Sequence, residues 1–272
     1  MTTTRLPLFP LSTVLFPGLV LPLNVFEARY RALVEELLKL PEDGPRPFGV
    51  IAIRDGHEVA PTALGLPEHV QPADPGPGAG FAANPMDSFF SVGCVADATT
   101  IRERGRGAGP AGPEDTGGGS GGTGGGPAAR PVTGYDLLAT GTSRFRLLSV
   151  DTEGPFLVGE VEMLPERTGE GAELLAAGVL GAFRAYQRQL AGAYDRTPAA
   201  NRDLPEDPSV VSYLVAATTV LYPAERQRLL EAPDTAARLR QELELLRREV
   251  RLIRSLPSVP AADFTLRPTH LN

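Results

Sequence analysis

Hydrophobic periodicity changes once along this chain of 272 residues, near Pro165. Before that point the apolar segments are short and alternate as strands do, so that Leu157 and Val161 fall on one face and Glu160 on the other. Beyond it, apolar residues recur every three or four positions, which is the spacing of one helix face. Strands followed by helices predict an α+β fold.

The first part of the chain contains five apolar segments with the character of strands. The earliest is interrupted by Pro and Gly, which predicts short, bent strands because each Pro removes a hydrogen-bond donor from the sheet. A turn is expected at Gly141, inside the fourth segment. The segments are residues 5–23, 48–53, 89–101, 137–150 and 156–163.

Two segments rich in Gly and Pro, residues 61–87 and 105–131, separate these predicted strands. The second holds 12 Gly and 4 Pro in 27 positions, so it cannot bury enough apolar surface to offset its chain entropy. Because strands flank it, we interpret it as a loop inserted in one domain. Doubling the length of such a loop costs only about 0.6 kcal/mol.

One helix is predicted among these strands. Asn24 is a favourable N-cap, and Glu27 follows at the spacing of a capping box. A buried stripe is expected from four apolar residues at helical spacing. They are Phe26, Tyr30, Leu33 and Leu37.

Four helices are predicted in the second part. Residues 209–221 are apolar nearly all round, which predicts a central, buried helix. Pro223 can begin a short helix that carries Leu229 and Leu230. The other two helices show one apolar stripe each: Leu175, Val179, Phe183, Tyr186 and Leu190 in the first, and Leu239, Leu243, Leu246, Val250 and Ile253 in the last.

Composition excludes several kinds of chemistry. Lys39 is the single lysine and follows Leu38, so no phosphate-binding loop of the GxxxxGK[ST] type is present. Cys94 is the single cysteine, which excludes an intrachain disulfide and a cysteine-rich zinc site and fits a reducing cytoplasm. The net charge of −7 argues against sequence-independent binding to DNA. We also expect no signal peptide and no membrane span.

No catalytic, cofactor-binding or metal-binding residue is predicted. Matches to GxSxG and GxGxxG fall in the glycine-rich segment 105–131, where they arise by chance and lack a flanking strand and helix. His57 precedes a glutamate as in zinc-protease helices, but Pro61 stands where the second histidine would be. His69 and His270 are isolated. We therefore expect no metal ion and no cofactor.

The last predicted helix carries a mixture of arginine and glutamate. This pattern is compatible with RNA binding, but we favour a solvated helix face with pairs such as Glu244–Arg248. The arginines are Arg238, Arg240, Arg247, Arg248, Arg251 and Arg254, and the glutamates among them are Glu242, Glu244 and Glu249.

Residues 6–38 resemble the opening of the Lon protease N-terminal (substrate-binding) domain family. The family pattern PLFPL, FPG, PL and FExRY is matched in order by residues 7–11, 16–18, 22–23 and 26–30. Later segments, including Gly141-x-x-Arg144-Phe145 and residues 223–231, also resemble the family. The resemblance spans roughly residues 5–256.

The resemblance implies a PUA-like β pseudo-barrel with one helix in residues 1–165, a helical bundle in 166–257 and a tail in 258–272. Phe26 and Tyr30 would then pack the helix onto the sheet, and Glu27 would pair with Arg29 or Arg144.

The implied function is a non-enzymatic, cytoplasmic module that binds other proteins. It would recognise exposed apolar segments through a groove between barrel and bundle or by strand addition at a sheet edge. The ATPase and Ser–Lys protease parts of Lon enzymes have no counterpart in this sequence, so we expect a stand-alone domain. An RNA-binding PUA-like module is the alternative, and an enzyme with an unrecognised site is the third hypothesis. The resemblance designates neither the protein-binding residues nor the oligomeric state.

Overall fold

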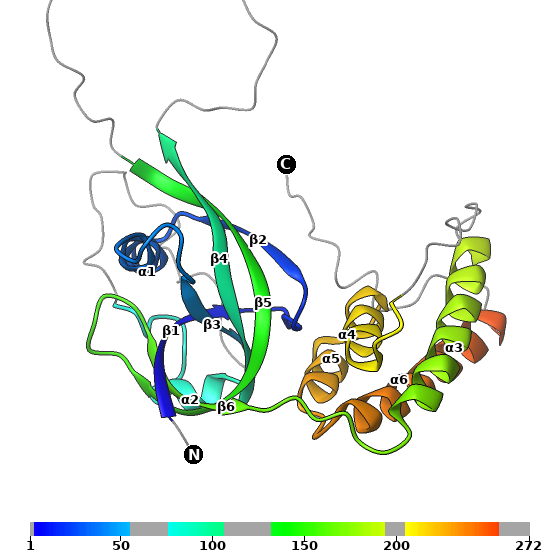
Figure 1. Ribbon diagram of the computed structural model, residues 1–272. Helices are drawn as coiled ribbons and strands as arrows, with labels where there is room; N and C mark the ends of the chain where they lie inside the picture. The colour runs from blue at the N-terminus through cyan, green and yellow to red at the C-terminus, as the bar shows by residue number, and fades with distance from the viewer. Residues whose placement is uncertain (1–2, 55–75, 106–131, 194–204, 256–272) are drawn as a thin grey trace, which may run out of the picture.

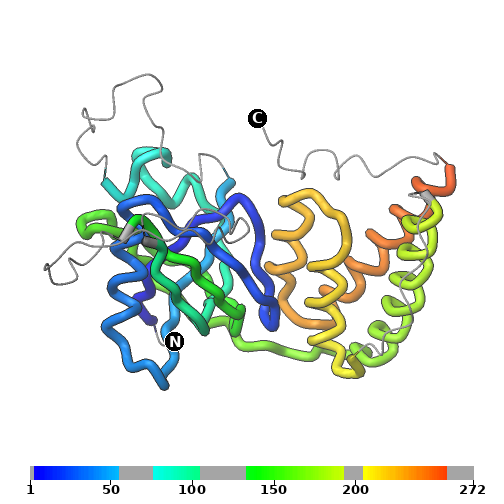
Figure 2. The backbone as a smooth tube through the Cα atoms, turned by 90° about the horizontal axis from the view of Figure 1, so that it is seen from above, coloured from blue at the N-terminus to red at the C-terminus, as the bar shows by residue number. Residues whose placement is uncertain are grey.

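The computed structural model describes residues 3–54, 76–105, 132–193 and 205–255. Its N-terminal part forms a curved sheet with a helix packed against it, and its C-terminal part forms a group of helices to one side (Figures 1 and 2). The predicted α+β class is therefore confirmed. The division into domains at residues 165 and 166 stays a prediction.

Six strands form one mixed sheet in the order β2-β5-β4-β3-β1-β6. β1 and β3 are parallel, and the other pairings are antiparallel. β5 also pairs with β6, so the sheet curls back on itself, but β2 extends beyond this pairing and the barrel is not closed. The strands are β1 (Thr3–Leu11), β2 (Val20–Val25), β3 (Pro47–Ala52), β4 (Val92–Gly105), β5 (Val132–Asp151) and β6 (Val158–Leu164).

β5 runs without a turn through Gly141, so the turn predicted there is wrong. The strand instead shifts its register against β4 at this point. A side chain at position 141 would collide with the carbonyl oxygen of Phe16 and lie 3.1 Å from Sγ of Cys94. Glycine is thus required by the close approach of the chain that precedes β2, whose Gly18 amide donates to the Gly141 carbonyl at 2.8 Å.

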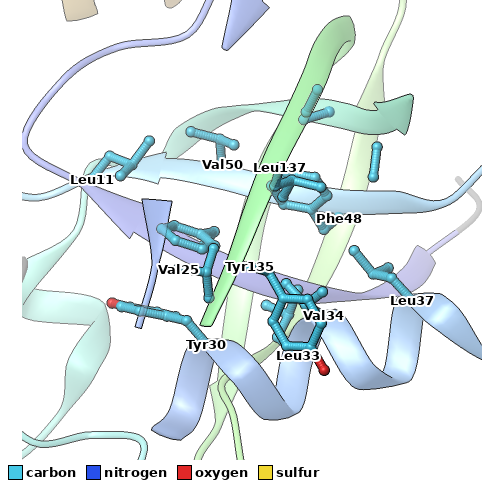
Figure 3. Packing of buried hydrophobic residues seen from close by; sticks show 14 of the residues in the cluster. Leu11, Val25, Tyr30, Leu33, Val34, Leu37, Phe48, Val50, Tyr135 and Leu137 are labelled. Carbon is cyan, nitrogen blue, oxygen red and sulfur yellow. The ribbon is translucent and has the colours of Figure 1, made fainter. Parts of the chain in front are cut away.

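α1 (Ala28–Leu38) covers one face of the sheet (Figure 3). Tyr30 stacks on Phe9 with ring centroids 4.2 Å apart, and Leu33 and Leu37 are buried as predicted. The stripe does not extend to Phe26, which precedes the helix and is 62% exposed. Burial of these side chains, each worth about 1.5–3 kcal/mol, stabilises the helix against the strands.

The predicted cap of α1 is wrong. Asn24 belongs to β2, and Glu27 is the N-cap residue, with no side-chain cap bond. Glu27 instead pairs with Arg29 at 3.1 Å. This confirms the first of the two partners expected for Glu27.

Arg29 connects α1 to the chain that precedes β4. Its Nη1 donates to the carbonyl oxygens of Pro77 and Ala79, at 3.2 and 2.8 Å. A four-residue helix, α2 (Pro85–Ser88), follows, where the sequence predicted only loop. Its formation is explained by Asn84, whose side chain accepts a hydrogen bond from the Met86 amide at 3.2 Å.

The four predicted C-terminal helices are confirmed. α3 and α6 lie along each other, and their apolar stripes share one buried cluster with α4 (Figure 2). α4 begins at Pro208 because Asp207 caps it, accepting from the Ser209 and Val210 amides. The helices are α3 (Ala172–Ala193), α4 (Pro208–Thr218), α5 (Pro223–Leu230) and α6 (Thr235–Ser255).

Several sequence expectations fall outside the described residues. These are most of the predicted loop 61–87, nearly all of the segment 105–131, the tail 258–272 and the three histidines. Among the residues that are described, no helix has the length and apolarity to cross a membrane.

Candidate functional site

The sheet and the helices meet through a shared apolar cluster. Phe16 and Val92 from the sheet side pack with Tyr213 of α4 and Leu229 of α5, and the rings of Phe16 and Tyr213 are 6.1 Å apart. Phe16 and Leu229 are fully buried. The two parts of the molecule are therefore held in a fixed relation by packing at this junction.

Side-chain hydrogen bonds to backbone carbonyls reinforce this junction. Nη1 of Arg144 in β5 donates to the carbonyl oxygens of Leu230 and Ala232, at 2.8 and 2.6 Å. Nε2 of Gln227 in α5 donates to the carbonyl of Val92 at 2.9 Å. Because bonds from charged donors are about twice as strong as neutral ones, Arg144 is the principal polar link between β5 and the end of α5.

Glu166, in the connection between β6 and α3, joins the two parts electrostatically. Its Oε1 lies 3.1 Å from Nη2 of Arg238 and accepts from the Thr235 hydroxyl at 3.0 Å. Its Oε2 accepts from the Tyr213 hydroxyl and lies 3.3 Å from Nε of Arg144. Each carboxylate oxygen thus has two partners, and residues from β5, α4 and α6 all contact one side chain.

The charge states in this cluster follow from its surroundings. Partial burial alone would raise the pKa of Glu166, but the Arg238 charge, the Tyr213 hydrogen bond and the Arg144 charge together hold that pKa below its usual range. Burial also raises the pKa of the Tyr213 phenol, which therefore stays protonated and donates. Glu166 is consequently an ionised acceptor between two arginines.

A groove of about 330 Å³ opens beside this cluster, between the sheet and α4. Its sheet side is formed by the turn around Leu19, by β5 and by Leu164, and its helical side by Val210 and Leu214. Val210 is 50% exposed, so an aliphatic side chain is accessible from solvent at this groove.

The groove carries almost no free charge. Arg144 and Glu166 are the charged residues among those that line it, and they are paired with each other. Its other polar groups are hydroxyls, as in Ser143 and Ser209. Such a surface can accept aliphatic side chains and can form hydrogen bonds with a peptide backbone.

The arginine-rich last helix is only in part the solvated face that the sequence suggested. Arg240, Arg247, Arg251 and Arg254 are exposed, as is Glu244. Arg238 is fully buried, with Nε and Nη1 bonded to the Leu229 carbonyl and the Ser212 hydroxyl. Arg248 pairs with Glu225 and with its neighbour Glu249, at 2.7 and 2.8 Å, rather than with Glu244. Sequence spacing alone favoured the i,i+4 partner, whereas tertiary packing supplies Glu225 from α5.

Glu166 is the residue of this site that the sequence reasoning missed. It lies in a polar connection with no helical or strand periodicity, so no local pattern marks it. Arg144, in contrast, belongs to a segment that resembles the family. For metal binding, the described part of the chain has no group of three or more His, Cys, Asp or Glu side chains, and the three histidines lie outside it.

Comparison with known proteins identifies the family. Residues 5–248 match the family model of the ATP-dependent protease La (LON) substrate-binding domain. Lon protease 2 of Myxococcus xanthus is 25% identical over 262 residues, covering 94% of this chain and 25% of the relative. Lon protease 2 of Syntrophobacter fumaroxidans is 26% identical over 275 residues, covering 97% of this chain and 28% of the relative. The chain thus spans about a quarter of the length of these relatives.

The fold is shared with a solved structure, the N terminal domain of Mycobacterium avium complex Lon protease. The two superpose with a TM-score of 0.52 at 16% sequence identity, over 90% of this chain and 98% of that one. The sequence match covers both the sheet and the helices that form the groove. The chain therefore belongs to the Lon substrate-binding domain family.

Proposed function

We propose that this chain is a non-enzymatic module that binds exposed apolar segments of other proteins in the groove between the sheet and α4. The observation that carries the proposal is the groove itself, whose accessible aliphatic residue Val210 lies opposite the turn around Leu19. Membership of the Lon substrate-binding domain family supports the same class of ligand.

The groove is suited to binding rather than to catalysis. A catalytic acid or base needs an ionisable group free to exchange a proton with the substrate. Glu166 is occupied by four neighbours, and the pKa of its carboxyl is lowered, so it stays ionised and bound within the protein. Its role is to hold the two walls of the groove together.

An extended peptide with aliphatic side chains fits this surface best. Aliphatic groups would contact Val210 and Leu214, and the backbone of the peptide would meet the hydroxyl groups of Ser143 and Ser209. Charged side chains would be disfavoured because Arg144 is already paired and buried. We place this activity in the cytoplasm, which suits a chain whose single cysteine is a free thiol.

Titration with a permanently unfolded reporter tests the proposal. Reduced and alkylated α-lactalbumin, labelled with a fluorophore, is expected to bind with an affinity that the Val210→Glu substitution weakens at least about tenfold. The control is Leu252→Glu on α6, because Leu252 is 49% exposed, close to the 50% of Val210, and does not line the groove. No binding by the natural chain, or equal loss in both variants, would refute the proposal.

A further inference from the structure

A second groove lies on the helical part, between α3 and α6, and is separate from the one beside α4. Its volume is about 250 Å³. Apolar residues from both helices line it, namely Ala182, Ala185, Leu246 and Val250. Three exposed arginines of α6 complete its lining: Arg247, Arg251 and Arg254.

In the described part of the chain, none of these three arginines forms an ion pair with an acidic side chain. Arg240 also lacks such a pair, but it donates to the backbone carbonyl of Glu170 at 3.4 Å. Arg238 is paired with Glu166 and Arg248 with Glu225, so those charges are compensated inside the protein. Arg247, Arg251 and Arg254 follow one another at i, i+4 and i+7, so they form a ridge about 10 Å long on one side of the helix. A positive ridge beside an apolar surface is conspicuous in a chain of net charge −7.

The residues that line this groove and its volume indicate which class of anionic ligand it can bind. RNA recognition relies on aromatic side chains that stack on bases, and none of the residues that line this groove is aromatic. The volume is below the range of about 300–1,000 Å³ that is common for small-molecule sites. An anionic membrane would require large apolar side chains exposed beside the arginines, whereas in this lining Leu246 is buried, Val250 is half-buried and the other two apolar residues are alanines.

We propose that this groove binds an acidic amphipathic helix of a partner protein. The apolar face of such a helix would lie over Ala182 and Ala185, where the small side chains allow close approach. Its Asp or Glu residues, spaced by three or four positions, would meet the arginine ridge. The apolar contact would supply most of the affinity, and the three charges would fix the orientation of the bound helix, as is general when a helix binds in a groove.

Two synthetic helical peptides test the proposal by fluorescence anisotropy. Both carry leucines on one face; the first has flanking glutamates, and the second has glutamine at the same positions. The natural chain is expected to bind the glutamate peptide at least about tenfold more tightly than the glutamine peptide at low salt, and the difference is expected to shrink as salt is added. The combined substitution Arg247→Gln, Arg251→Gln and Arg254→Gln should abolish this difference.

The matched control replaces three exposed arginines of the sheet, Arg5, Arg102 and Arg104, with glutamine. It changes the net charge by the same amount and is expected to leave the affinity for the glutamate peptide within about twofold. Circular dichroism checks that all variants keep their helices.

Four outcomes would overturn the proposal. The first is equal binding of both peptides, and the second is an equal loss of affinity in the control variant. The third is tighter binding of an oligouridine RNA than of the glutamate peptide, with the same arginines required. The fourth is that the natural chain binds neither peptide but self-associates in sedimentation equilibrium, and that the triple substitution abolishes this self-association. That result would mean that the groove binds a second copy of the chain.

Discussion

Glu166 and Arg238 are 72 residues apart in the chain and meet at 3.1 Å, one on the connection between sheet and helices and the other fully buried on α6. The guanidinium of Arg238 also lies 3.9 Å from the centre of the Tyr213 ring. A buried arginine is tolerated when its charge is compensated and its donors are bonded. Glu166 is the residue that provides this compensation, for Arg238 and for Arg144 alike.

Replacement of Glu166 by glutamine is expected to destabilise the protein by about 2–3 kcal/mol. Loss of one partner of a fully buried pair costs about 3–5 kcal/mol, and the expected value is smaller because the Glu166 side chain is 35% exposed. Urea unfolding followed by circular dichroism measures the change. Glu153→Gln, at an exposed carboxylate after β5, is the control and should change stability by less than about 0.5 kcal/mol. Equal stability of the two variants would contradict the role of Glu166.

Because of Glu242, the free energy of unfolding is expected to decrease as pH rises. Burial raises the pKa of this carboxyl well above its usual value, against the smaller opposing effect of Arg238, and neither oxygen has a hydrogen-bond partner in the described structure. From α4 and α5 it faces Val215, Ala216, Thr219 and Leu229, none of which is charged. The folded state therefore holds a proton that the unfolded chain releases above about pH 4.3.

Because the folded state binds this proton more tightly than the unfolded chain does, the free energy of unfolding decreases as pH rises. The stabilisation that Glu242 contributes is fully present below the pKa that its carboxyl has in the unfolded chain, and it is lost as pH rises through the pKa of the carboxyl in the folded protein. The amount lost is about 1.4 kcal/mol for each unit by which these two pKa values differ. Glu242→Gln should remove this slope, whereas Glu244→Gln, at an exposed position of the same helix, should retain it. Unfolding free energies measured between pH 5 and pH 9 test this. Parallel curves for the natural chain and Glu242→Gln would show that the carboxyl is ionised when folded.

Local sequence signals predicted the elements well and their long-range partners poorly. The alternation around Val161 and the stripe from Leu239 to Ile253 predicted β6 and α6, because each pattern reflects one buried face. Phe26 fits the stripe of α1 by spacing, yet it lies before the helix, since the chain is still leaving β2 at that point. Spacing cannot distinguish the last residues of a strand from the first turn of a helix.

The candidate site depends on contacts that no local pattern encodes. Arg238 and Arg248 look alike in the sequence, and their different burial is decided by Glu166 and Glu225, which come from other elements. The groove beside α4 was anticipated through the family resemblance as a space between barrel and bundle. Its residues could not be named, because Val210 and Leu164 are brought together only when the helices fold back onto the sheet.

Two glycine substitutions are expected to act in opposite directions. Gly141→Ala should destabilise the protein by about 1–3 kcal/mol, because the added carbon collides with the Phe16 carbonyl oxygen and contacts Cys94. Gly181→Ala, at an exposed position of α3 with nothing within 4 Å of the new carbon, should stabilise it by about 0.5–1 kcal/mol through helix propensity. Thermal unfolding of both variants compares them directly. A gain in stability for Gly141→Ala would show that β5 and the chain before β2 lie further apart.

Cys94 is expected to be unreactive in the folded protein. Its side chain has no exposed surface, and burial raises the pKa of the thiol to about 12, offset only in part by a hydrogen bond from Thr142 and the charge of Arg144. The thiolate, which is the reactive form, is therefore almost absent at neutral pH. Because the chain has one cysteine, labelling with Ellman's reagent reports on this position alone.

The expected result is slow labelling in buffer and rapid, stoichiometric labelling in concentrated urea, with a rate at intermediate urea that follows unfolding. Ser149→Cys, at an exposed position of β5, supplies a thiol that should react at once in the folded state and shows that the reagent is active. Fast labelling of the natural chain with unchanged circular dichroism would mean that β4 opens locally around Cys94. The packing of β5 at Gly141 against the Cys94 side chain would then be looser than their close approach in the structure indicates.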